Sequence, residues 1–207
     1  GEGKVPAQYQ LARVELVKGC LARKEYDRAL KLIEECYVYP HNLGEGKLPG
    51  AQENDFNYYK ARILQETGHA DEARALYEAA SVGNSQPAAA IYYNDQKPDK
   101  IFYQGLALLR LGRETEARSR FNNLISYGEK HLYDVFKMDY FAVSLPDLQI
   151  WEDDMDRKNV IHCNYLMGLG YLGLGDKTKA EKYFAAAAEL DNNHQGVQVH
   201  RMMLNEK

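Results

Sequence analysis

The feature that most constrains this chain is residues 160–190, where small and large apolar residues recur at helical spacing on both sides of Gly175. Gly168 before this glycine and Ala180 after it are small enough to let two antiparallel helices approach closely, and Phe184 fills the space beside that contact. Gly175 supplies the left-handed residue that ends the first helix. The stretch therefore predicts one helical hairpin.

The same pattern recurs three times upstream. The alanines of the second helices lie 44, 44 and 63 residues apart, at Ala29, Ala73, Ala117 and Ala180. An uninterrupted array of such hairpins repeats about every 34 residues, so additional segments must separate the pairs. Four helix pairs are predicted, at residues 6–37, 54–80, 99–124 and 160–190. The turn of the first pair contains Arg23 and Lys24, where a glycine is usual.

Three inserts and a terminal helix complete the predicted architecture. The inserts are residues 37–52, 81–98 and 125–158, and the terminal helix is residues 195–204. This last helix is expected to cover the exposed end of the stack, because repeat arrays need such a cap.

The inserts are predicted to be packed structure. The first is rich in Gly and Pro and predicts an ordered loop, whereas residues 88–93 of the second have enough length for one or two helical turns. In the third, residues 129–140 have helical periodicity, and residues 144–147 predict the cap and first turn of another helix. The aromatic side chains of these inserts would be costly to leave in water. We therefore expect residues 140–151 to lie against the third or fourth pair.

The four hairpins resemble tetratricopeptide (TPR) repeats in their pattern of small and large positions. This resemblance implies an all-α fold of the α-α superhelix type, with about four pairs stacked in a right-handed superhelix as one domain of residues 1–207. It also implies a scaffold for binding other proteins.

Four shorter segments are similar to the C-terminal repeat region of large bacterial proteins. The segments are residues 42–47, 92–96, 137–148 and 161–163. In that family the preceding half is a domain of unknown function that resembles sugar-binding and glycoside-hydrolase-associated β-sandwiches. The resemblance implies a neighbouring N-terminal, carbohydrate-related domain on the same polypeptide, and it implies no activity for this region.

Composition favours a globular protein of a reducing compartment. The formal net charge of −4 gives no electrostatic reason to expect nucleic acid or an anionic membrane as a partner. The longest uncharged run, residues 162–175, is shorter than the roughly 20 residues of a membrane helix. Cys20, Cys36 and Cys163 form no Cys-x-x-Cys pair, which favours free thiols and a cytoplasmic location. The chain begins at Gly1, which we interpret as a boundary within a longer sequence.

No set of residues predicts catalysis, a metal or a cofactor. The glycine-rich residues 44–47 lack the spacing and the Ser or Thr of a phosphate loop. The acidic residues 152–156 lack the alternate spacing of a calcium loop, and we interpret them as the start of a helix. His131 and Asp134 are one helical turn apart, which permits an imidazole–carboxylate pair but supplies no nucleophile. His162 and Cys163 are adjacent, so on a helix they cannot readily share one metal.

A partner-binding groove is predicted on the first helix of each pair. Tyr58, Phe102 and Tyr165 occupy equivalent positions that face inward in TPR hairpins. The neighbouring positions add Arg62, Leu106, Arg110 and Leu169 to the predicted groove. Chaperone-binding TPR proteins hold a terminal carboxylate there with Lys, Asn and Arg, but Leu106 and Leu169 stand where two of those polar residues would be.

The predicted groove is therefore apolar and aromatic with a basic edge, suited to a protein or peptide segment or to the neighbouring N-terminal domain. In the alternative interpretation, the three aromatic rings pack against adjacent repeats or an insert. The corresponding alternative function is a structural or oligomerisation region, such as a homodimer, whose groove is filled by its own inserts.

Overall fold

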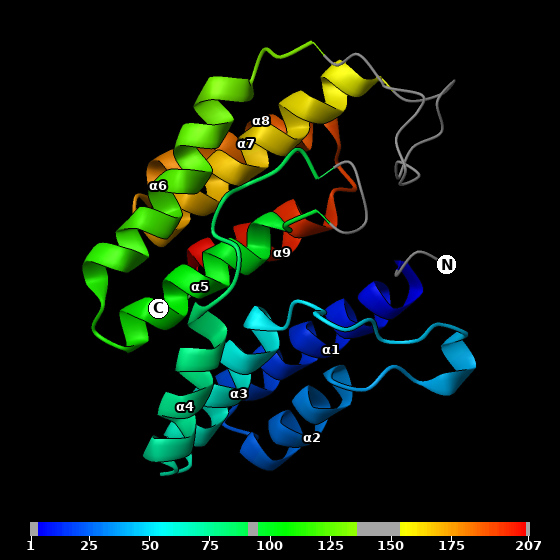
Figure 1. Cartoon of the computed structure of the whole chain (residues 1–207), viewed down its shortest axis with the longest axis vertical. Coiled ribbons are helices and arrows are strands. Elements are labelled where there is room, and N and C mark those ends of the chain that lie inside the picture. The colour runs from blue at the N-terminus through cyan, green and yellow to red at the C-terminus, as the bar shows by residue number, and fades with distance from the viewer. Residues whose placement is uncertain (1–3, 91–94, 136–153, 206–207) are drawn as a thin grey trace. The chain divides into compact units, whose positions relative to one another are not determined.

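The computed structural model describes residues 4–90, 95–135 and 154–205, and all regular structure within them is helical (Figure 1). The α-helices are α1 Lys4–Ala22, α2 Tyr26–Cys36, α3 Asn54–Glu66, α4 Ala70–Ser81, α5 Pro98–Arg110, α6 Glu114–His131, α7 Met155–Gly173, α8 Lys177–Leu190 and α9 Gln195–Met202. Two 3₁₀ turns, η1 His41–Leu43 and η2 Met203–Asn205, accompany them. The predicted pairs correspond to α1–α2, α3–α4, α5–α6 and α7–α8. The fold class is all-α, of the helical-hairpin type that builds α-α superhelices.

The contacts between residues divide the chain into two compact units. Unit 1 consists of Gly1–Gly83 and Leu106–Glu114, and unit 2 consists of Asn84–Gly105 and Thr115–Lys207. The first turns of α5 therefore belong to unit 2 and its last turn to unit 1. Each unit is described separately below.

In unit 1, the two hairpins pack through small residues of α2, α3 and α4. Ala29 and Cys36 of α2 are fully buried, as are Ala61 of α3 and Ala80 of α4. Helix α2 also contacts α3, and the Tyr37 ring that follows α2 meets Phe56 edge to face at 5.9 Å. The short side chains let the helices approach closely enough for the larger apolar residues to interdigitate.

The hairpin turns have a left-handed residue at the same place. Gly68, Gly112 and Gly175 have φ of 86°, 75° and 79°, and Lys24 stands at this place in the first turn with φ of 60°. A lysine rarely adopts this conformation, because its Cβ crowds the backbone. The first turn therefore needs support that the other turns do not.

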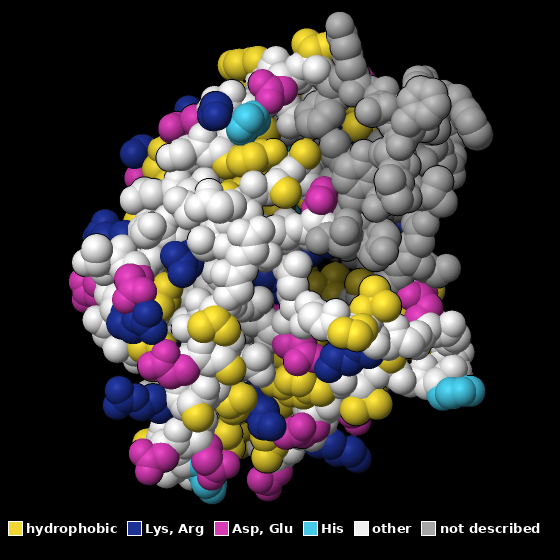
Figure 2. All heavy atoms as spheres, in the orientation of Figure 1, with side chains coloured by type: hydrophobic (Ala, Val, Ile, Leu, Met, Phe, Trp, Pro, Cys, Tyr) yellow, Lys and Arg dark blue, Asp and Glu magenta, His cyan; other side chains and the backbone are white. Residues whose placement is uncertain are grey.

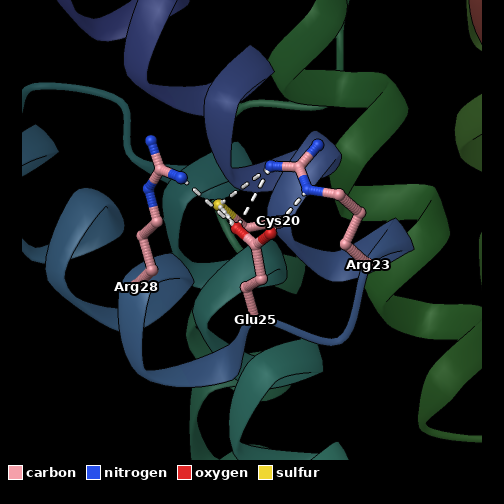
Figure 3. Close-up of polar contacts among 4 residues, drawn as sticks. All are labelled: Cys20, Arg23, Glu25 and Arg28. Carbon is pink, nitrogen blue, oxygen red and sulfur yellow. Dashed lines mark hydrogen bonds and ion pairs between the residues drawn. The ribbon is translucent and has the colours of Figure 1, made fainter.

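That support is a cluster centred on the Glu25 carboxylate (Figure 3). Arg23 Nε donates to Oε1 at 2.7 Å, and Arg28 approaches Oε2 from the opposite side at 3.5 Å. The buried Cys20 thiol also donates to Oε2, at 3.5 Å. The Arg23 hydrogen bond lowers the pKa of Glu25 to about 2. Because the ion pair between Arg23 and Glu25 spans Lys24, it holds the left-handed residue in place.

In unit 2, small residues lie at close helix crossings. A Cβ atom at Gly168 would lie 2.5 Å from Cδ1 of Phe184, and one at Gly105 would overlap the Phe121 ring. Ala117 and Ala180 are fully buried. The prediction that Gly168 and Ala180 permit a close helix approach is confirmed.

The second insert is packed, as predicted, but its described part is not helical. Residues 82–90 form no helical turn, and Ala90 has φ of 53°. The carbonyl oxygens of Asn84, Ser85 and Ala88 instead accept from side chains of the helices, namely Gln104 at 3.1 Å, Asn123 at 3.0 Å and His162 at 2.8 Å. The expected turn at residues 88–90 was therefore wrong, because these side chains satisfy carbonyls that a helix would otherwise pair. The rest of the expected turn, residues 91–93, lies outside the described part of the chain.

The other inserts and the cap were predicted with mixed success. The first insert is a loop with the single turn η1, and α9 with η2 forms the expected terminal helix. The periodicity predicted from residue 129 belongs to α6, which continues to His131. The helix predicted at residues 144–147 and the packing expected of residues 140–151 lie outside the described residues.

Candidate functional site

The groove positions predicted in unit 2 are buried. Phe102, Tyr165 and Leu169 have exposed fractions of 1%, 6% and 0%. The Phe102 ring lies 6.1 Å from the Phe121 ring, and the Tyr165 ring lies 6.4 Å from that of Phe184. These residues face the interior of their own unit.

Helix α9 covers two of them. Figure 1 shows α9 in red alongside α5, and the His200 ring lies 5.5 Å from that of Phe102 and 5.8 Å from that of Tyr165. His200 Nδ1 lies 2.7 Å from the Gly196 carbonyl oxygen. Because a carbonyl can only accept, Nδ1 carries the proton, and the Tyr165 hydroxyl is 3.1 Å from the same nitrogen. In unit 2, α9 of the same unit thus fills this part of the predicted groove.

The groove positions predicted in unit 1 form a different surface, which we call the arginine face and define as Tyr58, Arg62, Leu106 and Arg110. Tyr58 is buried, Arg62 and Leu106 are half-buried, and Arg110 is exposed. Over α2, α3 and α4, Figure 2 shows hydrophobic side chains lying between charges of both signs.

The tyrosines beneath the arginine face are held by ring contacts and one hydrogen bond. The Tyr58 ring lies 5.3 Å from that of Tyr59 and 5.9 Å from that of Tyr77. The Tyr77 hydroxyl donates to Gln65 Oε1 at 2.8 Å. The Arg62 guanidinium lies 5.9 Å from the centre of the Tyr59 ring, within cation–π range. The floor of the face is therefore a fixed aromatic layer.

Both arginines act electrostatically on the same hydroxyl. Burial raises the pKa of Tyr77 to about 12, while the charges of Arg110 and Arg62 oppose that shift. For Arg110, burial lowers the pKa, but interactions with Tyr58, including a hydrogen bond, and the charges of Tyr77 and Glu66 together outweigh burial, so the net shift is upward. Among the residues that the structure describes, neither guanidinium has a carboxylate within 4.0 Å. The face therefore presents two permanent cations whose charge no ion pair neutralises.

The residues considered for chemistry do not assemble into a reactive site. His131 Nδ1 pairs with Asp134 Oδ2 at 2.6 Å, as the spacing permitted. All three cysteines are buried, and burial raises the pKa of Cys163 to about 12 and also that of Cys20. Within residues 4–90, 95–135 and 154–205, no three His, Cys, Asp or Glu side chains could hold a metal ion. A thiol with a raised pKa is a poor nucleophile at neutral pH.

Local structure accounts for the other two motifs. Lys47 Nζ donates to the Tyr37 carbonyl at 3.1 Å and pairs with Glu53, so the glycine-rich segment closes a loop. Asp154 is the N-cap of α7 and accepts from the Arg157 N–H at 3.0 Å. In the described residues, no helix has the length and apolar character to cross a membrane.

An open hollow of about 700 Å³ in unit 1 was not predicted. It lies over the outer face of α2 and is lined in part by Leu30, Val38, Glu34 and Glu35. Glu34 pairs with Lys60 and Glu35 with Arg13. Asp27 and Lys31 also line the hollow, so its charged groups are of both signs. The arginine face, which presents two cations, is the stronger candidate for recognition.

Comparison with known proteins supports the interpretation of the fourth pair. The family model for the tetratricopeptide repeat matches residues 161–194, which contain most of α7 and all of α8. This hairpin is a tetratricopeptide repeat. The small positions Gly168 and Ala180 that first indicated a hairpin lie within it.

Three solved structures are similar at low identity. MamA, residues 41 to the end, from Desulfovibrio magneticus RS-1 is 14% identical over 99% of this chain and 86% of its own, with a TM-score of 0.31. A MamA RS-1 double mutant has the same identity and TM-score over 99% of this chain and 85% of its own. YrrB, described as a TPR protein with an unusual peptide-binding site, is 13% identical over 92% of this chain and 90% of its own, with a TM-score of 0.28.

Proposed function

We propose that this protein is a non-catalytic protein-binding module, and that the arginine face of unit 1 binds a protein segment containing an acidic residue beside an apolar one. The observation that carries the proposal is the position of Arg62 and Arg110, from two different helices, above a buried tyrosine layer, where neither guanidinium has a carboxylate within 4.0 Å among the residues that the structure describes. The tetratricopeptide repeat in the fourth hairpin supports the general class, because such helical-repeat proteins present extended binding surfaces.

The chemistry of the face favours a carboxylate in the partner. A guanidinium donates in a planar fork that matches both oxygens of a carboxylate, and such charge-assisted hydrogen bonds are about twice as strong as neutral ones. Half-buried Leu106 and Leu109, which is 40% exposed, add apolar area beside the charges. A segment with an acidic and an apolar side chain uses both features.

The segment belongs either to a separate protein or to the neighbouring N-terminal domain implied by the resemblance to the bacterial repeat region. Affinity capture with and without the upstream sequence distinguishes these two sources. If the upstream domain is the natural occupant, its presence blocks capture of external segments by this face.

Selection of peptides from a displayed random library tests the proposal directly. We expect peptides enriched on the wild-type protein to contain Asp or Glu next to an apolar residue, and to lose at least tenfold in affinity for the Arg62→Ala, Arg110→Ala double variant. Arg74, which is exposed on α4, provides the matched control. Arg74→Ala should bind like the wild type. Enrichment without acidic residues, or equal binding by both variants, would contradict the proposal.

The alternative function is a structural or oligomerisation region, and the observation that favours it is the burial of Phe102 and Tyr165 beneath α9. A concentration-independent homodimer in sedimentation equilibrium, together with no peptide enrichment on the monomer, would favour this function. Binding of acidic peptides by a monomer would favour the docking function.

A further inference from the structure

We infer that the surface of α5 and α7 beneath α9 is a helix-binding seat, and that it accepts α9 of a second copy of this chain in exchange for its own. The helix seat is defined as Phe102, Tyr103 and Tyr165. It lies within unit 2 and is independent of the arginine face. The helix now bound shows which chemistry the seat recognises.

Three residues of α9 define the recognition pattern. His200 is buried between the rings of Phe102, Tyr103 and Tyr165, with centroid distances of 5.5, 5.9 and 5.8 Å. These residues belong to a Gly-Val-x-x-His pattern whose first two members are Gly196 and Val197.

The helix seat limits which residue can occupy each position of the Gly-Val-x-x-His pattern. A Cβ atom at Gly196 would lie 2.7 Å from the Tyr165 hydroxyl oxygen, so a larger residue cannot be placed there without displacing that ring. Val197 is 1% exposed and supplies the apolar contact. His200 Nδ1, already bonded to the Gly196 carbonyl, lies within hydrogen-bonding distance of the Tyr165 hydroxyl. The seat therefore selects a small residue, an apolar residue and an imidazole on one helix face.

Helix α9 is the shortest of the described α-helices. It has eight residues, of which Val197 and His200 are buried. Two further contacts lie at the surface, where Arg201 pairs with Glu181 and Lys177 Nζ donates at 2.6 Å to the carbonyl of Leu204 in η2. A helix of this length is not stable alone in water, so its order depends on the seat. Exchange of an identical element between two copies preserves every one of these contacts.

A fluorescent peptide of residues 191–205 serves as the probe, and the acceptor is the full chain carrying Val197→Ala. That substitution weakens the chain's own α9 and leaves the seat intact. We expect saturable binding of the peptide to this variant at least tenfold tighter than to the wild type. Arg201→Ala is a second acceptor, because it removes only a surface ion pair of the chain's own α9, and circular dichroism verifies that both acceptors are folded.

Peptide variants test whether the helix seat recognises the Gly-Val-x-x-His pattern. His200→Ala and Gly196→Leu peptides should lose at least tenfold in affinity, whereas Met202→Ala should bind normally, because Met202 is 54% exposed. Mixing untagged full chains with full chains that carry a size tag should give a mixed dimer, and excess peptide should dissociate it. Absence of saturable binding to both folded acceptors, or equal binding of the His200→Ala peptide, would overturn the inference.

Discussion

At the scale of single residues, the first turn of the chain shows how an ion pair offsets the cost of a left-handed backbone conformation. Lys24 adopts the left-handed conformation that glycines adopt in the other three turns. The ion pair between Arg23 and Glu25 spans it, and Arg28 and Cys20 add further contacts to the same carboxylate. Even with these contacts, the left-handed backbone conformation at Lys24 carries an energetic cost that a glycine at this position would not have.

Replacing Lys24 by glycine should stabilise the protein by about 0.5 to 1 kcal/mol, because relief of the left-handed strain exceeds the added entropy of the unfolded chain. The reciprocal change Gly68→Ala should destabilise it by about 1 kcal/mol, because the same conformation then carries a Cβ atom. Chemical denaturation of both variants measures these differences. A less stable Lys24→Gly variant would show that the lysine side chain itself contributes to the turn.

The close crossings of unit 2 predict a second set of stability changes. Gly105→Leu and Gly168→Leu should each lower the free energy of unfolding by about 1 to 3 kcal/mol, because the added side chains would enter the Phe121 and Phe184 rings. Gly46→Leu is the matched control, since a Cβ atom there meets nothing within 4 Å. Thermal unfolding that does not separate the control from the other two variants would contradict the packing.

These small positions were predictable from the sequence, while the exposure of the aromatic residues was not. Gly168 and Ala180 follow from periodicity, because only small residues permit a close crossing at that spacing. Phe102 and Tyr165 occupy positions that are open in a bare hairpin, so their burial depends on α9, which is distant in sequence. No local pattern determines whether such a ring is an anchor for a partner or part of the core.

At the scale of elements, α9 and the second insert show that short segments take their structure from the helices they contact. Helix α9 begins at an N-cap histidine, His194, whose Nδ1 accepts from the Val197 N–H at 3.1 Å. The carbonyls of Asn84, Ser85 and Ala88 accept hydrogen bonds from side chains of α5, α6 and α7. The alanines at 88–90 favour a helix by propensity, but these tertiary hydrogen bonds decided the conformation. The sequence therefore predicted the terminal helix and the packing of the second insert correctly, and the helical turn at residues 88–90 incorrectly.

Acid should destabilise the folded state through His162 and His194 before it affects the carboxylates. Burial lowers the pKa of His162 to about 4 and lowers that of His194 as well. The folded state thus binds fewer protons than the unfolded state, so the stabilisation is complete above the ordinary histidine pKa of about 6.5 and is lost as the pH falls from there toward about 4. We expect unfolding at pH 5 to require about 2 kcal/mol less than at pH 7.

Two features of this pH dependence make it specific. Glu25, whose pKa is lowered to about 2, loses its contribution only below the ordinary glutamate pKa, so it does not act between pH 7 and 5. His162→Asn should flatten the dependence, whereas His41→Gln, a change at an exposed loop histidine, should leave it unchanged. Equal slopes in the wild type and His162→Asn would show that His162 is not the titrating group.

At the scale of the whole molecule, two surfaces that align in sequence differ in structure between the two units. In unit 2 the equivalent positions are covered by α9, whereas in unit 1 they present Arg62 and Arg110 above buried tyrosines. Alignment of the repeats predicted one continuous groove. It could not reveal this division, because the covering residues Val197 and His200 lie outside the repeats.

Stability and binding should consequently respond to different substitutions. Phe102→Ala should lower the free energy of unfolding by about 3 to 5 kcal/mol, because the ring is 1% exposed and packs against Phe121. The Arg62→Ala, Arg110→Ala variant should change the free energy of unfolding by less than about 1 kcal/mol, because neither arginine has an ion pair to lose with any residue that the structure describes.

The same double variant should lose most of the salt dependence of binding. Affinity of the wild type for an acidic peptide is expected to fall steeply between low and physiological salt, because exposed charges are screened over about 8 to 10 Å. The double variant should bind weakly at every salt concentration.

The Tyr58→Ala variant should show whether the buried ring supports the arginine face or contacts the peptide. If Tyr58→Ala weakens binding by about 1 to 3 kcal/mol while Phe102→Ala weakens only folding, Tyr58 is an anchor and Phe102 is core. If both variants lose stability and bind the peptide normally, the aromatic residues act in the core alone, and recognition rests on the two arginines.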